Sequence, residues 1–439
     1  MQYIPNIVFV IILIAGIGYF AKNVRKLIRN IKLGKDVDRT DNKKERFNNM
    51  ARIALGQSKM VRRPIAGILH IIVYLGFIII NIEVLEIIID GVFGTHRIFA
   101  FLGGLYDFLI GSFEVLALLV LVSVFIFWIR RNVINIRRFK TLKGWPKNDG
   151  NIILYFEVVL MTLFLTMNAA DLQLQNLGAD HYVKAGAYPI SQFISPLFDG
   201  MSEGSLILLE RGAWWMHIIG ILIFLNYLYF SKHLHILLAF PNTYYGDLNP
   251  KGQMDNLEAV TNEVMLMMDP NADPFAAPAG DEPEGEPEKF GASDVTDLNW
   301  VQLLNSYTCT ECGRCTSECP ANQTGKKLSP RKIMMDTRDR LQEVGDNIDK
   351  NGSFVDDGKQ LLNDYITTEE LWACTSCNAC VEACPVSISP LSIILDMRRY
   401  LVMEQSAAPS DLNNMMSNIE NNGAPWPFNQ MDRLNWSQE

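Results

Sequence analysis

Two short cysteine runs constrain the fold and chemistry of this chain more than any other part of its sequence. One reads CTECGRCTSECP over residues 309–320, and the other reads CTSCNACVEACP over residues 374–385. Each follows the pattern C-x2-C-x2-C-x3-C-P, which is the spacing of thiolates that bind a cubane [4Fe–4S] cluster where a protein holds two such clusters. Zinc is the alternative, but a zinc site takes four ligands and has no use for a third cysteine at this interval. The pattern therefore predicts two [4Fe–4S] clusters.

The fourth cysteine of such a run, beside its proline, ligates the cluster of the other run. We therefore assign one cluster to Cys309, Cys312, Cys315 and Cys384. The second cluster is assigned to Cys374, Cys377, Cys380 and Cys319. The two runs contain all eight cysteines of the chain, so none is left for a disulfide or for catalysis. Thiolates of this kind suit a reducing compartment, so we expect the soluble half to face the cytoplasm.

Apolar residues make up 49% of the chain and crowd into roughly the first 240 residues. Five segments there are long enough to cross a bilayer, which takes about 20 residues. They lie near residues 3–21, 64–90, 100–129, 150–170 and 213–239. The net charge of −9, with no basic stripe, argues against nucleic acid as a partner. We therefore expect a transmembrane domain over residues 1–240, followed by a soluble half.

The distribution of Lys and Arg predicts the orientation of the five spans. The connection 21–63 carries 14 of these residues and 130–149 carries 7, whereas 91–99 and 171–212 carry only Arg97, Lys184 and Arg211. The basic connections are therefore expected in the cytoplasm, with the N-terminus outside and the C-terminal half inside. This agrees with the independent argument from the cysteines, and it predicts a multi-pass protein of the cytoplasmic (inner) membrane.

Two histidines are predicted to hold a b-type haem on the cytoplasmic side. His217 and His235 are 18 residues apart on the predicted fifth helix, so they share a face but stand about 27 Å apart and cannot serve one haem. His70, seven residues past Arg63, lies at a depth similar to that of His235. His70 and His235 are therefore the predicted axial pair, and separate hydrogen bonds between helices are the alternative. His233 points away from this face and is expected at the membrane interface.

A second haem is predicted at the outer side. The position on the second helix that would face His217 is occupied by Ile88, so the nearest candidate mate is His96 in the outer loop. A haem on His217 and His96 and a hydrogen bond from His217 to a neighbour or a quinone head group both remain open. Glu83, Glu86 and Glu114 lie in or near the spans. They either carry protons to a quinone or pair inside the bundle.

The soluble half divides by composition into a linker, a cluster domain and a tail. Residues 241–297 form a linker whose Pro-, Ala- and acid-rich part reads as a flexible tether. Residues 298–403 form the cluster domain, with predicted helices near 330–345 and from Pro390 to about 403, and a loop or short hairpin over 345–365. Residues 404–439 form a tail whose Trp426 and Trp436 are expected to dock on a partner or on the cluster domain. The predicted fold is all-α: a five-helix transmembrane bundle followed by an α-helical ferredoxin domain.

Two resemblances extend this interpretation. The segment with Trp215-Met216-His217, Ser231 to His235 and Pro241-Asn242 resembles the haem-bearing helix of the nitrate reductase gamma-subunit family, in the branch found in heterodisulfide-reductase-related membrane complexes. Residues 298–436, with both cysteine runs and with Trp426, Arg433 and Trp436 in the tail, resemble the cluster subunit of those complexes and of anaerobic glycerol-3-phosphate dehydrogenase. Two features depart from these families: the usual second-helix ligand of an outer haem is missing, and so are the Cys-Cys-Gly repeats that hold the catalytic cluster.

The resemblance implies an electron-transfer subunit that links menaquinone or ubiquinone to a cytoplasmic redox partner through one or two b-type haems and two [4Fe–4S] clusters. It implies that catalysis lies on a partner subunit, either a Cys-Cys-Gly-containing protein or a flavoprotein. One alternative is the membrane anchor and electron conduit of a flavin-dependent dehydrogenase for glycerol 3-phosphate or a hydroxy acid. A redox sensor is the other alternative, and it would need neither haem nor quinone.

Overall fold

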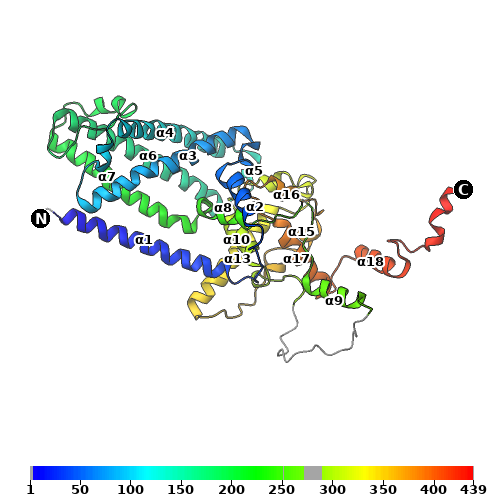
Figure 1. Ribbon diagram of the computed structural model, residues 1–439. Coiled ribbons are helices and arrows are strands. Elements are labelled where there is room, and N and C mark those ends of the chain that lie inside the picture. The colour runs from blue at the N-terminus through cyan, green and yellow to red at the C-terminus, as the bar shows by residue number, and fades with distance from the viewer. Residues whose placement is uncertain (1–2, 251, 271–288, 439) are drawn as a thin grey trace.

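The computed structural model describes residues 3–250, 252–270 and 289–438, and most of these residues form helices. No strand forms among them; the only ladder-type contacts are the isolated bridges Lys35–Asn299 and Leu362–Ile366. Figure 1 shows an elongated helical bundle at one end, a compact group of shorter helices at its base, and a tail that leaves this group. The predicted all-α fold is confirmed.

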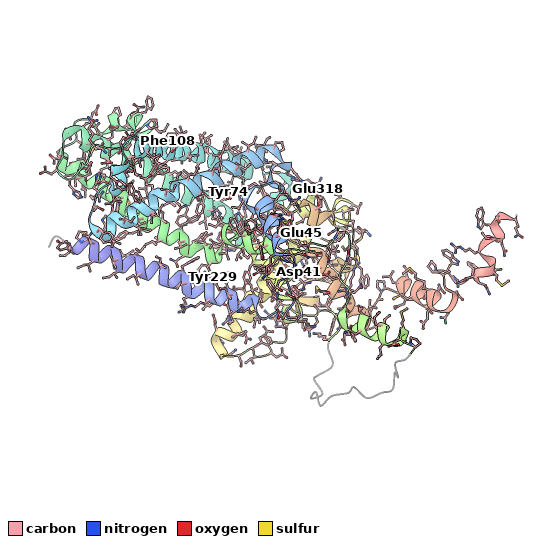
Figure 2. The ribbon with its side chains drawn as sticks, viewed as in Figure 1. Asp41, Glu45, Tyr74, Phe108, Tyr229 and Glu318 are labelled. Carbon is pink, nitrogen blue, oxygen red and sulfur yellow. The ribbon has the colours of Figure 1, made fainter. Side chains whose placement is uncertain are left out.

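Five helices are long and apolar enough to cross a membrane. They are α1 (Ile4–Ile31), α3 (Pro64–Phe93), α4 (Gly104–Trp128), α6 (Trp145–Leu177) and α7 (Glu203–Tyr227). Proline in the first turn starts α3 and α6, and a left-handed glycine ends each of them, at Gly94 and Gly178. Large apolar side chains such as Ile11, Leu85 and Phe108 point outward from the bundle, as lipid-facing residues do. Figure 2 shows Phe108 at the end of the bundle far from the shorter helices.

The remaining helices are shorter and mostly belong to the soluble half. Those of α type are α2 (Lys43–Met50), α5 (Arg137–Lys140), α8 (His235–Tyr244), α9 (Glu258–Met268), α10 (Trp300–Thr308), α11 (Arg314–Ser317), α12 (Pro320–Gln323), α13 (Pro330–Asn351), α14 (Leu361–Asp364), α15 (Thr368–Trp372), α16 (Ala379–Ala383), α17 (Pro390–Met403) and α18 (Ser410–Asn422). Turns of 3-10 or π type are η1 (Ala51–Leu55), η2 (Met60–Arg62), η3 (Ile98–Leu102), η4 (Ile129–Val133), η5 (Ser191–Phe193), η6 (Ser195–Phe198), η7 (Leu228–Phe230), η8 (Lys232–Leu234), η9 (Val295–Asp297) and η10 (Gln430–Ser437).

The fifth predicted span is wrong in its bounds, and one inference from it fails. The helix begins at Glu203 rather than 213, and it ends at Tyr227. Ser231 is extended, and α8 begins only at His235. The cause is a contact distant in sequence: the Asp149 carboxylate accepts a hydrogen bond of 2.6 Å from the Ser231 hydroxyl and one of 3.1 Å from the Lys232 amide. His217 and His235 therefore lie on different helices, contrary to the prediction.

The cluster domain packs its helices around one apolar core. Ser329 and Ser389 cap α13 and α17, each followed by proline in the first turn, as the sequence predicts. The predicted helix over 330–345 continues to Asn351, which shortens the predicted loop. Buried apolar side chains from α10, α13, α15 and α17 fill the core: Leu303, Ile333, Leu341, Leu371, Ile393 and Met397.

Backbone and side-chain contacts join the cluster domain directly to the membrane bundle. The Asn30 amide at the end of α1 donates to the Tyr307 hydroxyl of α10 at 2.9 Å. Gly345 of α13 permits this approach, because a Cβ there would lie 2.4 Å from the Asn30 amide nitrogen. Beyond α1, the Lys35 amide donates to the Leu298 carbonyl at 2.8 Å. Figure 2 shows Glu45 and Glu318 at this junction.

The linker and the tail differ from this compact junction. The most acidic part of the predicted tether, residues 271–288, lies outside the described residues. In the tail, α18 and η10 extend away from the cluster domain (Figure 1). Trp426 is 45% exposed and Trp436 is 76% exposed, so neither packs on the cluster domain as one of the two expectations had it.

The buried Arg340 offers a test of the cluster domain. This guanidinium is fully buried and bonds Asp294 at 2.8 Å, Asp357 at 2.6 Å and the Lys359 carbonyl at 2.8 Å. We expect Arg340→Met to lower the free energy of unfolding by roughly 2–4 kcal/mol, because two carboxylates lose their partner. Chemical denaturation of the detergent-solubilised protein measures this loss. Lys327→Met, which breaks the exposed pair with Glu369, is the control and is expected to cost about 0–1 kcal/mol; equal losses would contradict the prediction.

Candidate redox centres

The two cysteine runs adopt the same backbone path. Each has left-handed residues two and four positions after its first cysteine: Glu311 and Gly313 in the first run, Ser376 and Asn378 in the second. A short helix follows in each case, α11 or α16, and these two helices lie against each other. Glycine and asparagine tolerate the left-handed conformation best, which accounts for their presence at the start of the two helices. The local sequence thus folds two matching loops that face one another.

The thiols of the two loops interleave. Burial raises the pKa of Cys384 to about 11, and Cys312 of the other run is the next contribution in the same direction. Burial likewise raises the pKa of Cys380 to about 12, with contributions from Cys374 of its own run and Cys319 of the other. The fourth cysteine of each run therefore stands among the first three of its counterpart. All eight cysteines are free thiols in the described chain.

This donor set fits cubane clusters better than single metal ions. Nowhere in the described residues do three or more His, Cys, Asp or Glu side chains converge as they would on one ion. The four thiolates around a cubane cluster each bind a different iron, so they stand farther apart than the ligands of a single ion. Two sets of interleaved, unpaired thiols are the arrangement that two [4Fe–4S] clusters require.

The predicted inner histidine pair is brought together, although His235 lies on α8 rather than on the fifth span. The ring centroids of His70 and His235 are 6.3 Å apart, and the ring planes are tilted by 42°. A metal–imidazole bond is about 2.0 Å, and a ring adds about 1 Å from nitrogen to centroid, so two imidazoles on one metal have centroids about 6 Å apart. The observed spacing therefore leaves room for one metal between the rings.

The hydrogen bonds of these rings suit axial ligation. Nδ1 of His235 lies 3.0 Å from the Lys232 carbonyl, which only accepts, so this nitrogen carries the proton and leaves Nε2 free. Nδ1 of His70 is buried without a partner among the described residues. Burial lowers the pKa of His235, so its imidazole is neutral at physiological pH, as a metal ligand must be.

His233 lies beside this site, whereas the sequence predicts that it points away from the face that carries His235. Its ring centroid lies 5.5 Å from that of His235 and 5.3 Å from that of Phe224. Burial lowers the pKa of His233 to about 3, and the neighbouring imidazoles of His235 and His70 act in the same direction. The break before α8 turns its side chain inward, and no periodicity in the sequence signals that break.

The structure does not bring His217 and His96 together. The buried His217 places Nδ1 3.0 Å from the Leu160 carbonyl, and its ring lies beside Phe164. His96 instead places Nε2 3.3 Å from Asp171, and its ring contacts those of His181 and Tyr182. In the part of the chain that the structure describes, no ring contact joins His96 to His217.

A buried polar network occupies the outer end of the bundle. Its centre is Arg97, which donates to Glu83 at 3.2 Å, to Asn168 at 2.8 Å and to Asp171 at 2.8 Å. Oε2 of Glu83 and Nδ1 of His96 are buried without partners among the described residues. Both residues line a cavity of about 20 Å³, which is large enough for a water molecule. Glu83 was a candidate from the sequence, but Arg97 was not. The one sequence feature that marks Arg97 is that no other Lys or Arg occurs in the outer connection 91–99.

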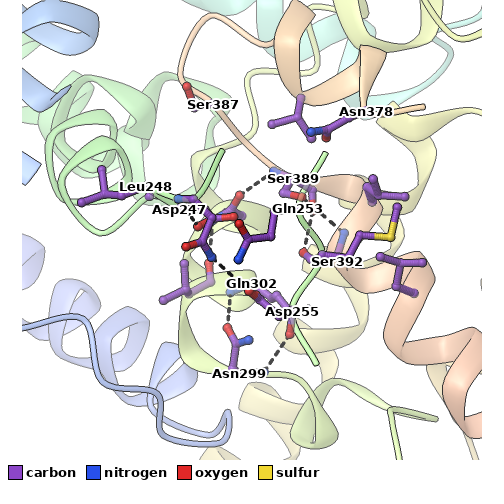
Figure 3. Close-up of a pocket in the computed structure, with 18 of the residues that line it drawn as sticks. Asp247, Leu248, Gln253, Asp255, Asn299, Gln302, Asn378, Ser387, Ser389 and Ser392 are labelled. Carbon is purple, nitrogen blue, oxygen red and sulfur yellow. Dashed lines mark hydrogen bonds between the residues drawn. The ribbon is translucent and has the colours of Figure 1, made fainter. Parts of the chain in front are cut away.

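An open cleft of about 1390 Å³ lies beside the cluster domain and reaches the second cysteine run. Charged, amide, hydroxyl and apolar side chains all line it, and Figure 3 shows Gln302, Asn378 and Ser389 around it. Cys377, the one exposed cysteine, is part of its wall. The cleft therefore gives access from solution to the second run, whereas Cys309 of the first run is buried.

Comparison with known proteins agrees with this interpretation of the cysteine runs. Residues 308–388 match the model of the 4Fe-4S dicluster domain. The chain is 28% identical to the "Probable iron-sulfur-binding oxidoreductase FadF" of Bacillus subtilis, over 99% of this chain and 61% of the relative. It is 26% identical to the "EtfAB:quinone oxidoreductase" of Syntrophomonas wolfei, over 92% of this chain and 55% of that protein.

A shorter match covers the cluster domain alone. One subunit of the ferredoxin/F(420)H(2)-dependent CoB-CoM heterodisulfide reductase of Methanosarcina acetivorans is 36% identical over 27% of this chain and 60% of its own length. No solved structure matches. The chain spans about three fifths or less of the length of these curated relatives. The comparisons thus show a 4Fe-4S dicluster domain over residues 308–388 and a similarity to iron–sulfur oxidoreductases over most of this chain.

Differential alkylation tests the thiol environments. In protein stripped of iron, we expect Cys377 to react with iodoacetamide at pH 8 at least about tenfold faster than Cys309. Cys377 is exposed, whereas burial raises the pKa of Cys309 to about 12 and leaves almost no thiolate. Peptide mass spectrometry measures both rates in one sample, and iron-loaded protein serves as the protected control. Equal rates at the two cysteines would contradict the described burial.

Proposed function

We propose that this chain is a membrane-bound electron-transfer unit that links a quinone pool to a cytoplasmic redox partner through a b-type haem and two [4Fe–4S] clusters. One observation carries the proposal: the first cysteine run contacts the segment that leads into the helix of His70. Arg314, between Cys312 and Cys315, donates to the Lys59 carbonyl at 3.1 Å and to the Met60 carbonyl at 3.3 Å. These residues immediately precede α3, which carries His70.

The cluster ligands in this proposal are the two cross-run sets predicted from the sequence. Cys309, Cys312, Cys315 and Cys384 hold the first cluster. Cys374, Cys377, Cys380 and Cys319 hold the second. The interleaving of Cys384 with Cys312 and of Cys319 with Cys380 supports both sets. Each cluster, when bound, accepts and releases one electron at a time, and the chain's own contribution is to fix and tune the site.

The haem ligands in this proposal are His70 and His235, and the geometry of their rings is the support. A second haem on His217 and His96 has no such support, so the proposal takes one haem. The Lys232 carbonyl orients His235, and burial keeps the imidazole neutral. The bundle domain then spans residues 1–240, as the nitrate reductase gamma-like resemblance implies.

Two observations support a quinone as the membrane substrate in this proposal. The printed name of the Syntrophomonas wolfei relative includes quinone, and the outer network holds acid–base groups that face a water-sized cavity. Reduction of a quinone consumes two electrons and two protons, and quinol oxidation releases them. The Glu83 carboxyl and the His96 imidazole are the groups that hold such protons in this proposal, because each has an unpartnered atom.

The cytoplasmic partner in this proposal meets the chain at the cleft beside Cys377. Names of relatives give two candidates, an EtfAB-type partner and a heterodisulfide reductase subunit. Either fits the prediction of a flavoprotein or a Cys-Cys-Gly-containing subunit that performs the catalysis. The basic connections of the bundle, which contact the cluster domain, support a cytoplasmic location for this half.

Spectroscopy of histidine variants tests the haem and quinone parts together. We expect a b-type α-band in the reduced-minus-oxidised spectrum of the purified protein, and loss of that band in His70→Leu and His235→Leu. We also expect a water-soluble naphthoquinone to reoxidise the band in the wild-type protein. His181→Leu, in the outer loop, is the matched control and should keep the band. A wild-type protein without the band, or a His70→Leu variant that retains it in full, would contradict the haem assignment.

Cysteine variants test the ligand sets. In Cys384→Ser we expect the first cluster to be lost or converted, and the second to persist, because Cys384 completes the set of Cys309, Cys312 and Cys315. In Cys319→Ser we expect the reverse. Electron paramagnetic resonance and iron content measure both outcomes. Loss of the second cluster alone in Cys384→Ser would show that each run binds its own cluster.

A further inference from the structure

Arg138 carries buried, unbonded hydrogen-bond donors at the edge of the first cysteine run. It comes from α5, a short helix between two membrane spans, and not from the cluster domain. Its Nε and Nη1 are buried and have no hydrogen-bond partner among the described residues. A guanidinium N–H that is buried and unbonded costs about 1–3 kcal/mol or more, so such a group normally faces a negative charge.

The first run lies where that charge is expected. Gly313, inside the run, sits so close to α5 that a Cβ there would lie 3.4 Å from the Arg138 Cβ. Arg331 fixes this approach by donating to the Arg138 carbonyl at 2.8 Å and to the Thr141 hydroxyl at 2.6 Å. Burial lowers the pKa of Arg138 to about 10, and interaction with Cys312 acts in the opposite direction. The guanidinium is therefore protonated at physiological pH.

Further cations surround the first run, several of them from the membrane half. Besides Arg138 they are Arg63, Lys232, Arg314, Arg331 and Arg338. Four carboxylates pair with these six cations: Glu311 with Lys232 and Arg338, Asp149 with Lys232, Asp339 with Arg338, and the exposed Glu318 with Arg63. Arg314 and Arg331 are only 5% and 6% exposed, so solvent screens them weakly.

The second run has a different charge environment. Arg398 lies beside it, but its guanidinium donates to the carbonyls of Leu371 and Cys374 and to the Ser376 hydroxyl. Arg62 is nearby and is paired with Glu382 at 2.5 Å. Lys59 donates to the Val381 carbonyl and the Ser387 hydroxyl at this run. Among the described residues, the second run therefore has three cations and one carboxylate around it, and none of these cations has buried, unbonded donors like those of Arg138.

We infer that Arg138 is a positioning residue that reaches from the membrane domain to the first cluster and makes it the easier of the two clusters to reduce. The inference rests on the proposed function, in which both runs hold [4Fe–4S] clusters. A cluster that gains an electron becomes more negative, so a nearby buried positive charge stabilises its reduced form and raises its potential. Exposure of Cys377 raises the potential of the second cluster, whereas the first run has the unbonded donors of Arg138 and the weakly screened Arg314 and Arg331 beside it.

The place of Arg138 in the chain indicates on which of the two clusters a shared electron resides. Arg138 belongs to the half of the chain that carries His70, so the membrane domain itself sets the potential of the cluster beside it. An electron shared by the two clusters then resides on the membrane side, away from the open cleft. Arg138 thereby ties the tuning of the first cluster to the docking of the two halves.

A redox titration of the full-length protein, followed by electron paramagnetic resonance, tests the inference. We expect two resolved midpoints, and we expect Arg138→Gln to lower the higher one alone. The ratio of reduced to oxidised first cluster at a fixed potential should fall about tenfold, a shift of about 59 mV for a one-electron couple. Arg138→Lys keeps the charge and should restore most of that shift.

Two matched variants complete the experiment. Arg137→Gln removes the same charge from the exposed neighbour on α5 and should move neither midpoint. Arg398→Gln should lower the midpoint of the second cluster and not that of the first. If Arg138→Gln does not fold, Arg314→Gln serves the same purpose, and it should lower the same midpoint.

The outcomes separate the inference from the proposed function. If the wild-type protein contains no [4Fe–4S] signals, the proposed function fails, and the inference fails with it. If both clusters are present but Arg138→Gln and Arg314→Gln leave the midpoints unchanged, only the inference fails. It also fails if Arg138→Gln moves the two midpoints equally, or if the cluster that responds to Arg398→Gln has the higher midpoint.

Discussion

The contact between the basic connections of the membrane bundle and the cluster domain is the interaction on which the rest of the structure depends. Lys232 and Arg338, from different halves of the chain, both bind the buried Glu311. Burial alone would raise the pKa of Glu311, but the two cations hold it below its usual value. Buried ion pairs add little net stability but cost a great deal to break, so this network selects one docked geometry. That geometry places the first cysteine run beside the helix that carries His70.

The same contact gives a second role to the lysine and arginine residues that predict the orientation of the spans. The basic segment 21–63, which includes the end of α1, was used to predict which side of the membrane it faces. In the structure, several of its residues bind the cluster domain: Lys26, Arg29, Lys59, Arg62 and Arg63. A charge bias that indicates topology here also builds an interface. The two uses are compatible, because the cluster domain and the basic connections are on the same side of the bundle.

Features with a local cause were predictable from the sequence. The cysteine spacing, the Ser-Pro starts of α13 and α17, and the apolar length of the spans are all encoded by neighbouring residues. The break before α8 was not predictable, because Asp149 holds Ser231 from 82 residues away. The proximity of His70 and His235 was predicted from depth alone, although the helix assumed for His235 was wrong. Arg138 and Arg97 could not be singled out, because only packing shows which arginine is buried and where its donors point.

The break between α7 and α8 has a consequence for the assembly of the molecule. It transfers His235 from the membrane bundle to a short helix that packs on the cluster domain, where Asn242 donates to the Val386 carbonyl at 2.8 Å. Val386 follows Cys384 and Pro385, so this hydrogen bond joins α8 to the chain at the end of the second cysteine run. In the proposed function, one haem ligand is thus carried by the bundle and the other by the interface. On that proposal, the haem pocket and the iron–sulfur loops assemble in a single event, and a chain that fails at one step lacks the geometry for the other.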